Sequence, residues 1–86
     1  MAGMITSSEP TIEFDATAVD VECGNGMLRV KLADGREIAA PLEYFPRLRD
    51  ASQQELDNWQ LIGHGYGIEW ESLDEHLSVK GLMRLH

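Results

Sequence analysis

The sequence has little cysteine and no long apolar run. Its only cysteine, Cys23, has no second thiol in the chain with which to form a disulfide, and no Cys-x-x-Cys pair is present to hold zinc. The segment from Met1 to Glu13 has neither the charged start nor the apolar stretch of a signal peptide or membrane anchor. We therefore expect a protein of the reducing cytoplasm that makes no membrane contact.

Basic residues are also scarce. The 86-residue chain has 7 Lys and Arg residues against 15 Asp and Glu residues, which gives a formal net charge of −8. Binding to nucleic acid depends on cations that displace phosphate counterions, so direct contact with nucleic acid is not expected. The charge favours either a basic protein partner or simple solubility. A chain this short builds only a small core, which excludes a large, deep active site.

The chain divides into two parts. Residues 1–14 are mostly small and polar, without periodicity, and predict a flexible N-terminal tail. The remaining residues, 15–86, contain no internal repeat and no low-complexity linker. They therefore predict one small domain.

The clearest structural signal is a β-hairpin around Asn25-Gly26, the dipeptide most typical of a two-residue type I′ turn. Apolar and charged residues alternate on both sides of it, so one face of the hairpin is apolar and the other carries complementary charges. The cross-strand pairs expected from this turn are Val19–Leu32, Asp20–Lys31, Val21–Val30 and Glu22–Arg29.

A third strand is predicted after Asp34-Gly35. A two-residue loop at this point would flip the apolar face, whereas a three-residue loop with Gly35 in the left-handed conformation pairs Leu32 with Ile38. We take the three-residue loop. The sequence thus predicts an antiparallel three-stranded meander over residues 17–40.

Short helices and a second hairpin should follow. Residues 41–45 have helical spacing that Pro46 interrupts, which predicts a short helix or turn and a second turn up to residue 50. Ser52 and Glu55 form a capping box, so a helix should begin at residue 53 and present Leu56 and Trp59 to the core.

Two further elements complete the predicted fold. Residues 61–62 and 66–70 predict a second β-hairpin, and Ser78 is placed to cap a short C-terminal helix that shows Val79, Leu82 and Met83 on one side. The fold class is α+β, with a three-stranded meander, short central helices, a second β-hairpin and a short C-terminal helix.

Catalytic and metal-binding signals are weak. His64 between glycines could act as a general base, but a tight turn that requires positive φ explains those glycines better. His64, Asp74, Glu75 and His76 match no closed zinc or calcium pattern. We therefore expect no enzyme activity, no catalytic residues, no cofactor and no bound metal.

The strongest functional candidate is a group of carboxylates around Trp70: Glu69, Glu71, Asp74 and Glu75. Acidic residues beside a large aromatic suit the docking of a basic partner, with Trp70 as the anchor. A solvated acidic face is the alternative interpretation. Three further aromatics, Tyr44, Phe45 and Trp59, are expected in the core because so small a domain needs them there.

From Leu28 onward, the chain resembles the short form of a bacterial family, domain of unknown function family 2442. The resemblance is carried by five segments: Leu32 to Arg36, Pro41 to Leu48, Asn58-Trp59, Gly67 to Trp70 and Leu73 to Leu82.

This resemblance implies a small α+β domain that occurs alone or ahead of a helix-turn-helix domain. It also implies a gene often found beside that of another small protein, in a toxin–antitoxin-like arrangement. It transfers no catalytic residues. Where relatives usually have His-Trp-Pro, this chain has Glu69-Trp70-Glu71, so its choice of partner is not implied by the family.

Together these features predict a non-catalytic protein-interaction module that acts as an antitoxin-like or regulatory partner of a small basic protein. The alternative is an acidic inhibitor or nucleic-acid mimic that occupies the basic groove of a nuclease or effector. Self-association through a free sheet edge, the strand that begins near Arg36, is a further open possibility.

Overall fold

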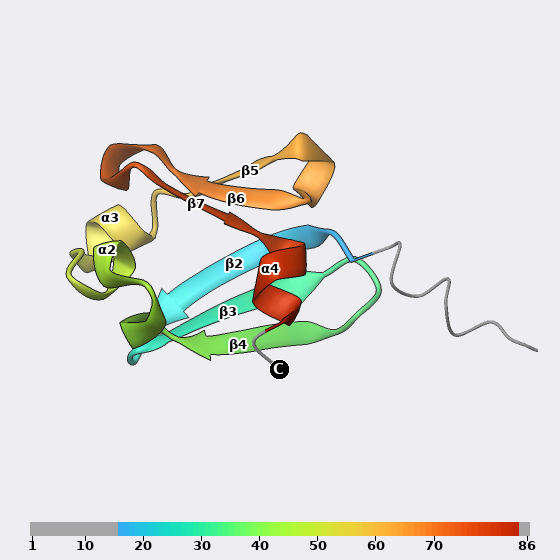
Figure 1. Ribbon diagram of the computed structural model, residues 1–86, viewed down its shortest axis with the longest axis horizontal. Coiled ribbons are helices and arrows are strands. Elements are labelled where there is room, and N and C mark those ends of the chain that lie inside the picture. The colour runs from blue at the N-terminus through green and yellow to red at the C-terminus, as the bar shows by residue number, and fades with distance from the viewer. Residues whose placement is uncertain (1–15, 85–86) are drawn as a thin grey trace, which may run out of the picture.

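The computed structural model describes residues 16–84. These residues form two three-stranded antiparallel sheets that face each other, with α2 and α3 at one end and α4 nearer the other (Figure 1). The predicted α+β class, with a meander followed by short helices and a second β region, is confirmed. The prediction for residues 1–14 lies outside the described part of the chain.

The first sheet contains the predicted meander. Asn25 and Gly26 form its first turn with φ values of 53° and 77°, because a type I′ turn requires positive φ at both central residues. The predicted pairs Asp20–Lys31, Val21–Val30 and Glu22–Arg29 are all confirmed. The strand order is β2-β3-β4, with β2 at Ala18–Gly24, β3 at Met27–Leu32 and β4 at Glu37–Pro41.

The predicted pairing of Val19 with Leu32 is wrong. The register shifts between Ala18 and Asp20, so that Ala18 lies opposite Leu32. A bulge adds one residue to a strand and interrupts its alternation. Ala18 therefore takes the buried position, while Val19 is 56% exposed.

The loop between β3 and β4 has the predicted length but closes a different pair. Gly35 has φ of 95°, and the Leu32 N–H donates to the Arg36 carbonyl at 2.8 Å. Ile38 pairs with Val30, so the predicted Leu32–Ile38 pairing is wrong by two residues. Because side chains repeat every two residues along a strand, this error leaves the apolar face where it was predicted.

Three short helices link the sheets. Pro46 is the first residue of its helix, and Phe45 before it is extended, as the steric effect of proline requires. The capping box is confirmed: Ser52 Oγ accepts from the Glu55 N–H, and Glu55 Oε1 accepts from the Ser52 N–H. The helices are η2 at Leu42–Tyr44, α2 at Pro46–Arg49 and α3 at Gln53–Leu56.

The second sheet has one more strand than predicted. The segment of its third strand contains a single apolar residue, Leu77, so it shows no alternation in the sequence. The strand order is β5-β6-β7, with β5 at Gln60–Ile62, β6 at Gly67–Trp70 and β7 at Glu75–Ser78. Its turns contain η3 at Gly63–Gly65 and η4 at Glu71–Leu73, and the chain continues into α4 at Val79–Met83.

One apolar core joins the two sheets. Trp70, at 0% exposure, belongs to this core, and its Nε1–H donates to the Leu56 carbonyl at 2.9 Å. That bond ties β6 to α3. Ser78 Oγ accepts from the Gly81 N–H, which confirms the predicted cap of α4. The largest fully buried side chains are Trp70, Leu28, Leu48, Ile68, Val30 and Val79.

Candidate functional site

Trp70 is not the exposed anchor that the sequence analysis predicted. Ile68 and Trp70 alternate with Gly67 and Glu69 along β6, and both large side chains face the core. The same alternation that predicted this strand therefore also fixed the inward direction of Trp70. A partner cannot reach a side chain with no exposed surface, so the proposed role of Trp70 in binding is wrong.

The carboxylates around Trp70 separate in space. Glu69 is half-buried on β6 and accepts a hydrogen bond from Gln60 Nε2 at 2.9 Å. Glu75 is half-buried and lies opposite Trp70 at the start of β7. Of the four, only Glu71 and Asp74 are classed as exposed, and they lie at the two ends of the η4 turn. The four acids therefore differ in exposure, and two of them are only partly available to a partner.

Asp74 is held by a neighbouring helix. It adopts the left-handed conformation with φ of 53°, which Asp tolerates better than most residues. Arg47 of α2 lies with Nη1 3.5 Å from the Asp74 carboxylate, and the same nitrogen donates to the Asp74 carbonyl. The pair is exposed and contributes little stability, but it places α2 beside the η4 turn.

Tyr44 is exposed, so its predicted place in the core is wrong. It is 60% exposed on η2 and makes an edge-to-face contact with Phe45, with ring centroids 6.4 Å apart. Phe45 and Trp59 are half-buried and pack against the core, in line with their prediction. The single turn of η2 buries only Leu42, which leaves no inward position for Tyr44.

The elements at the α2 and α3 end of the molecule (Figure 1) carry a group of exposed residues that we call the acidic end. Its cations are already engaged by acids of the same end: Arg47 by Asp74, and Arg49 by Asp50 at 3.0 Å. The hydrogen bond from Arg49 also holds the pKa of the Asp50 carboxyl below its usual value. The acidic end consists of Glu43, Tyr44, Asp50, Glu71 and Asp74, with Arg47 and Arg49.

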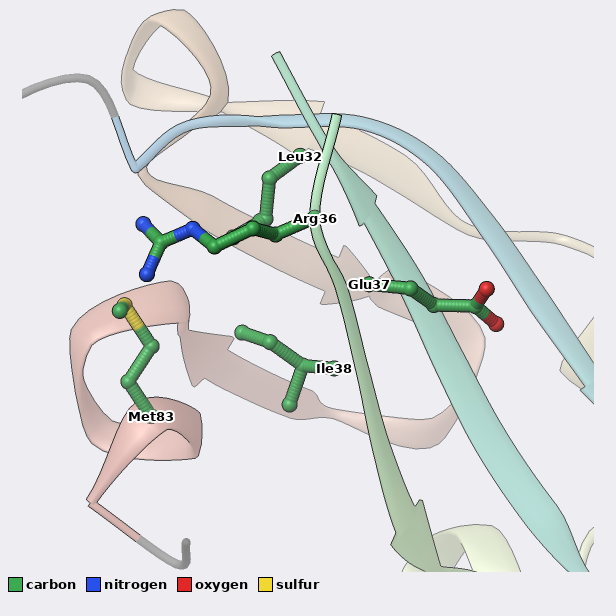
Figure 2. A pocket seen from close by; sticks show the side chains of 5 residues that line it. All are labelled: Leu32, Arg36, Glu37, Ile38 and Met83. Carbon is green, nitrogen blue, oxygen red and sulfur yellow. The ribbon is translucent and has the colours of Figure 1, made fainter. Parts of the chain in front are cut away.

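A second feature is a groove of about 190 Å³ between β4 and α4. Leu32 and Ile38 form its buried, apolar floor. Arg36 and Met83 face each other across its opening, while Glu37 points to the other side of the strand (Figure 2). Arg36 Nε is 2.8 Å from the Asp34 carboxylate, so its charge is balanced within the turn. The groove offers an apolar surface beside a sheet edge.

His64 and Cys23 lie in different surroundings, the former in an exposed turn and the latter buried. His64 is exposed in a turn where Gly63, His64 and Gly65 all have positive φ, which confirms the turn interpretation of these glycines. Burial raises the pKa of the Cys23 thiol to about 11, so little thiolate exists at neutral pH. Within residues 16–84, no three His, Cys, Asp or Glu side chains are grouped to hold a metal ion. No helix of this range is long and apolar enough to span a membrane.

The chain is similar to proteins whose function is unknown. A crystal structure of a protein of unknown function from Rhodospirillum rubrum ATCC 11170 is 32% identical, with a TM-score of 0.72, over 80% of this chain and 86% of that chain. An uncharacterised protein from Chromobacterium violaceum, solved by NMR, has the same fold at 23% identity, with a TM-score of 0.72 over 88% of this chain and 72% of that one. No curated protein matches the chain.

The resemblance noted in the sequence is confirmed over nearly the whole described region. The family model "Protein of unknown function (DUF2442)" matches residues 18–86, from the first residue of β2 onward. The chain therefore belongs to the DUF2442 family of proteins of unknown function.

Proposed function

We propose that the protein is a non-catalytic, cytoplasmic protein-interaction module that binds a basic partner protein at its acidic end. The observation that carries this proposal is the exposure of Tyr44, 60% of whose surface is open to solvent beside the exposed Glu43. A domain of this size generally needs its aromatic side chains in the core. Tyr44 contributes little to that core and is available to contact a partner.

The acidic end combines the two features of a docking site. Tyrosine offers a rigid apolar ring with a polar tip, a combination enriched at the centres of interfaces. The contact with Phe45 supports one side of the Tyr44 ring, so little freedom is lost when a partner covers the rest. Carboxylates around such an anchor attract a cationic partner and orient it during encounter.

The identity of the partner decides the biological role. An antitoxin-like role follows if the partner is toxic alone, and a regulatory role follows if the partner is an enzyme or DNA-binding protein. The same acidic end could instead imitate phosphates in the basic groove of a nuclease or effector. DNA would then compete for that groove.

Affinity capture of the tagged protein from its native host, at low and moderate salt, tests the proposal. We expect a stoichiometric small basic protein. Tyr44→Ala should weaken its binding by about 30-fold, the loss typical of an interface hot spot. Glu71→Lys should weaken it by about tenfold, more at low salt than at moderate salt.

Glu22→Lys is the matched control, since it makes the same charge change on the outer face of the first sheet, opposite Arg29. Equal losses for Glu71→Lys and Glu22→Lys would show that only net charge matters, and would overturn the acidic end as a site. Capture of a nuclease that DNA displaces would replace this proposal with the mimic. An absence of any captured protein would also contradict the proposal.

A further inference from the structure

We propose that the groove between β4 and α4 is filled by the chain's own N-terminal segment, with the Phe14 side chain seated on Leu32 and Ile38. This surface is distinct from the acidic end, so the proposal does not depend on the proposed function. Three features support it: the shape of the groove, the place where the chain enters the fold, and the residue pattern of the segment before that point.

The groove has room for one aromatic ring. Its volume is about 190 Å³, and an apolar cavity of about 150 Å³ is large enough to bind benzene. Leu32 and Ile38 form its apolar floor, and the half-buried side chain of Met83 forms one wall (Figure 2). Arg36 lies at the opening, with its charge balanced by Asp34. An apolar side chain therefore fits this surface better than an acidic or a basic one.

The described chain enters the fold next to this groove. The Ala33 N–H donates to the Thr17 carbonyl at 2.8 Å, so the residues just before β2 run alongside the end of β3. Ala18 lies opposite Leu32, which is part of the groove floor. In Figure 2, the blue segment that leads into β2 lies on the side of the groove toward which Arg36 extends. The chain before β2 therefore starts one strand away from the groove floor.

The segment before β2 has the residue pattern needed to fill the groove. Apolar residues stand at every second position, with polar or acidic residues between them: Ile12, Phe14, Ala16 and Ala18. Ala16 and Ala18 are buried in the core. Side chains two residues apart on an extended chain point to the same side. Continued toward the N-terminus, the pattern directs Phe14 to the inner face of the sheet, where the groove lies.

The connection is short enough for this contact and favours it over others. Phe14 is two residues before Ala16, and two residues of extended chain span roughly 7 Å. Neighbouring strands lie about 4.8 Å apart, so Leu32 on β3 is within reach. A group attached by so short a linker has an effective concentration of about millimolar, which a free ligand or a second copy would have to exceed.

The proposal also divides the N-terminal segment. The composition of residues 1–14 predicts a flexible tail, and docking of Phe14 limits that tail to the residues before Ile12. Glu13 and Asp15 alternate with the apolar residues and would face solvent on the opposite side.

NMR spectroscopy of the full chain tests the contact directly. Nuclear Overhauser effects should join the Phe14 ring to the Met83 methyl group, and Phe14→Ala should shift that methyl signal because the ring is removed. Ile5→Ala truncates an apolar side chain nearer the start of the same segment and should leave the signal unchanged. Absence of the contact in the unmodified protein would overturn the proposal.

Thiol labelling measures how well the groove is covered. In Met83→Cys, a bulky maleimide should react at least about tenfold more slowly than in the double variant with Phe14→Ala, because the reagent reaches the thiol only when the segment opens. Phe14→Leu should keep most of this protection, since it preserves an apolar side chain. Val19→Cys, at a position that is 56% exposed, should react at the same rate with and without Phe14→Ala. The native Cys23 is buried and should react slowly in every variant.

Three results of the labelling experiment would contradict the proposal. Equal rates with and without Phe14→Ala would show that the groove is open in the full chain. Protection lost in Leu85→Ala but kept in Phe14→Ala would assign the groove to the C-terminal end, two residues beyond Met83. Protection that rises with protein concentration would assign it to a second copy. None of these results bears on the capture of a basic partner, which depends on the acidic end.

Discussion

The two edge strands of the first sheet, β2 and β4, differ in how many of their outward backbone groups are hydrogen-bonded to other parts of the molecule. On β2, two of the outward backbone groups are bonded: the Val21 N–H donates to Asp20, and the Cys23 carbonyl accepts from Gln53 of α3. On β4, the outward groups of Glu37 and Ala39 are open within the described residues. Both strands carry local features that limit pairing: a bulge at Val19 and a proline at residue 41. The difference shows that protection of an edge comes mainly from neighbours that donate or accept its hydrogen bonds.

The β2 side is also more tightly packed. A Cβ atom built on Gly65 of η3 would lie 2.8 Å from the Ala18 carbonyl oxygen and 3.2 Å from Thr17 Cβ. A Cβ built on Gly35, in the turn before β4, would meet nothing within 4 Å. The two glycines have nearly the same φ, 91° and 95°. They therefore allow a matched comparison of the two sides.

The largest expected effect comes from replacing these glycines. Gly35→Ala should lower the free energy of unfolding by about 1 kcal/mol, the strain of a left-handed residue with a Cβ. Gly65→Ala adds a backbone clash and should lower it by about 3 kcal/mol. Urea unfolding of both variants measures the difference. Equal losses would show that η3 can move away from β2 without a penalty, and the tight packing of this edge would be refuted.

The next effect is seen in hydrogen exchange of the unmodified protein. The Ala39 amide should exchange at least about tenfold faster than the Val21 amide, because within residues 16–84 only the latter is hydrogen-bonded. NMR-detected exchange of both amides provides the measurement. Slow exchange at Ala39 would mean that another group covers this edge.

A smaller effect is expected from removing the cap on β2. Gln53→Ala leaves the Cys23 carbonyl without its partner and should lower the free energy of unfolding by about 1 kcal/mol. Gln60→Ala removes an exposed side-chain bond to Glu69 and should change it by less than about 0.5 kcal/mol. Thermal or urea unfolding of the two variants compares them. If Gln60→Ala has the larger effect, the cap on β2 is not a significant part of its stability.

The smallest effect is a pH dependence in the turn before β4. The Arg36 backbone N–H donates to the Asp34 carboxylate at 3.0 Å, and together with the Arg36 side chain it lowers the pKa of Asp34. Because the folded-state pKa lies below the unfolded value, the stabilisation is present above the unfolded pKa. It is lost as the pH falls through the folded pKa.

NMR titration of Asp34 and acid unfolding of Asp34→Asn measure this contribution. We expect a midpoint below the usual value of 3.8 for the carboxyl, and a smaller loss of stability in acid for the variant. A midpoint at or above 3.8 would show that the turn does not hold the carboxylate in its charged form.

Elements with strong local signals were predicted from the sequence. Asn25-Gly26 determined the first hairpin, and the capping residues Ser52 and Ser78 determined the starts of α3 and α4. These signals depend on neighbours a few residues apart, which a single sequence displays directly. Strand β7 was missed because it pairs with β6 and shows only Leu77 to the core. Its place depends on a partner strand and is not visible in its own residues.

The candidate site was predicted only in part. Glu71 and Asp74 are exposed as expected. Trp70 was predicted at the surface but lies in the core, and Tyr44 was predicted in the core but lies at the surface. The alternation along β6 contained the signal for Trp70, since Ile68 and Trp70 had to share the inner face. No comparable signal existed for Tyr44, because a single turn of helix has no periodicity from which to read its inner side.

The sequence by itself determined the family, the α+β class, the meander with its turns, and the acid-rich composition. Each of these depends on residue types and on spacings within a few positions of the chain. Only the tertiary structure decided which edge of the first sheet is closed, because Gln53 reaches Cys23 from 30 residues away. It also decided that Tyr44 is exposed and that Arg47 meets Asp74 across 27 residues. Contacts of this range depend on how sheets and helices pack, and local propensity carries no information about them.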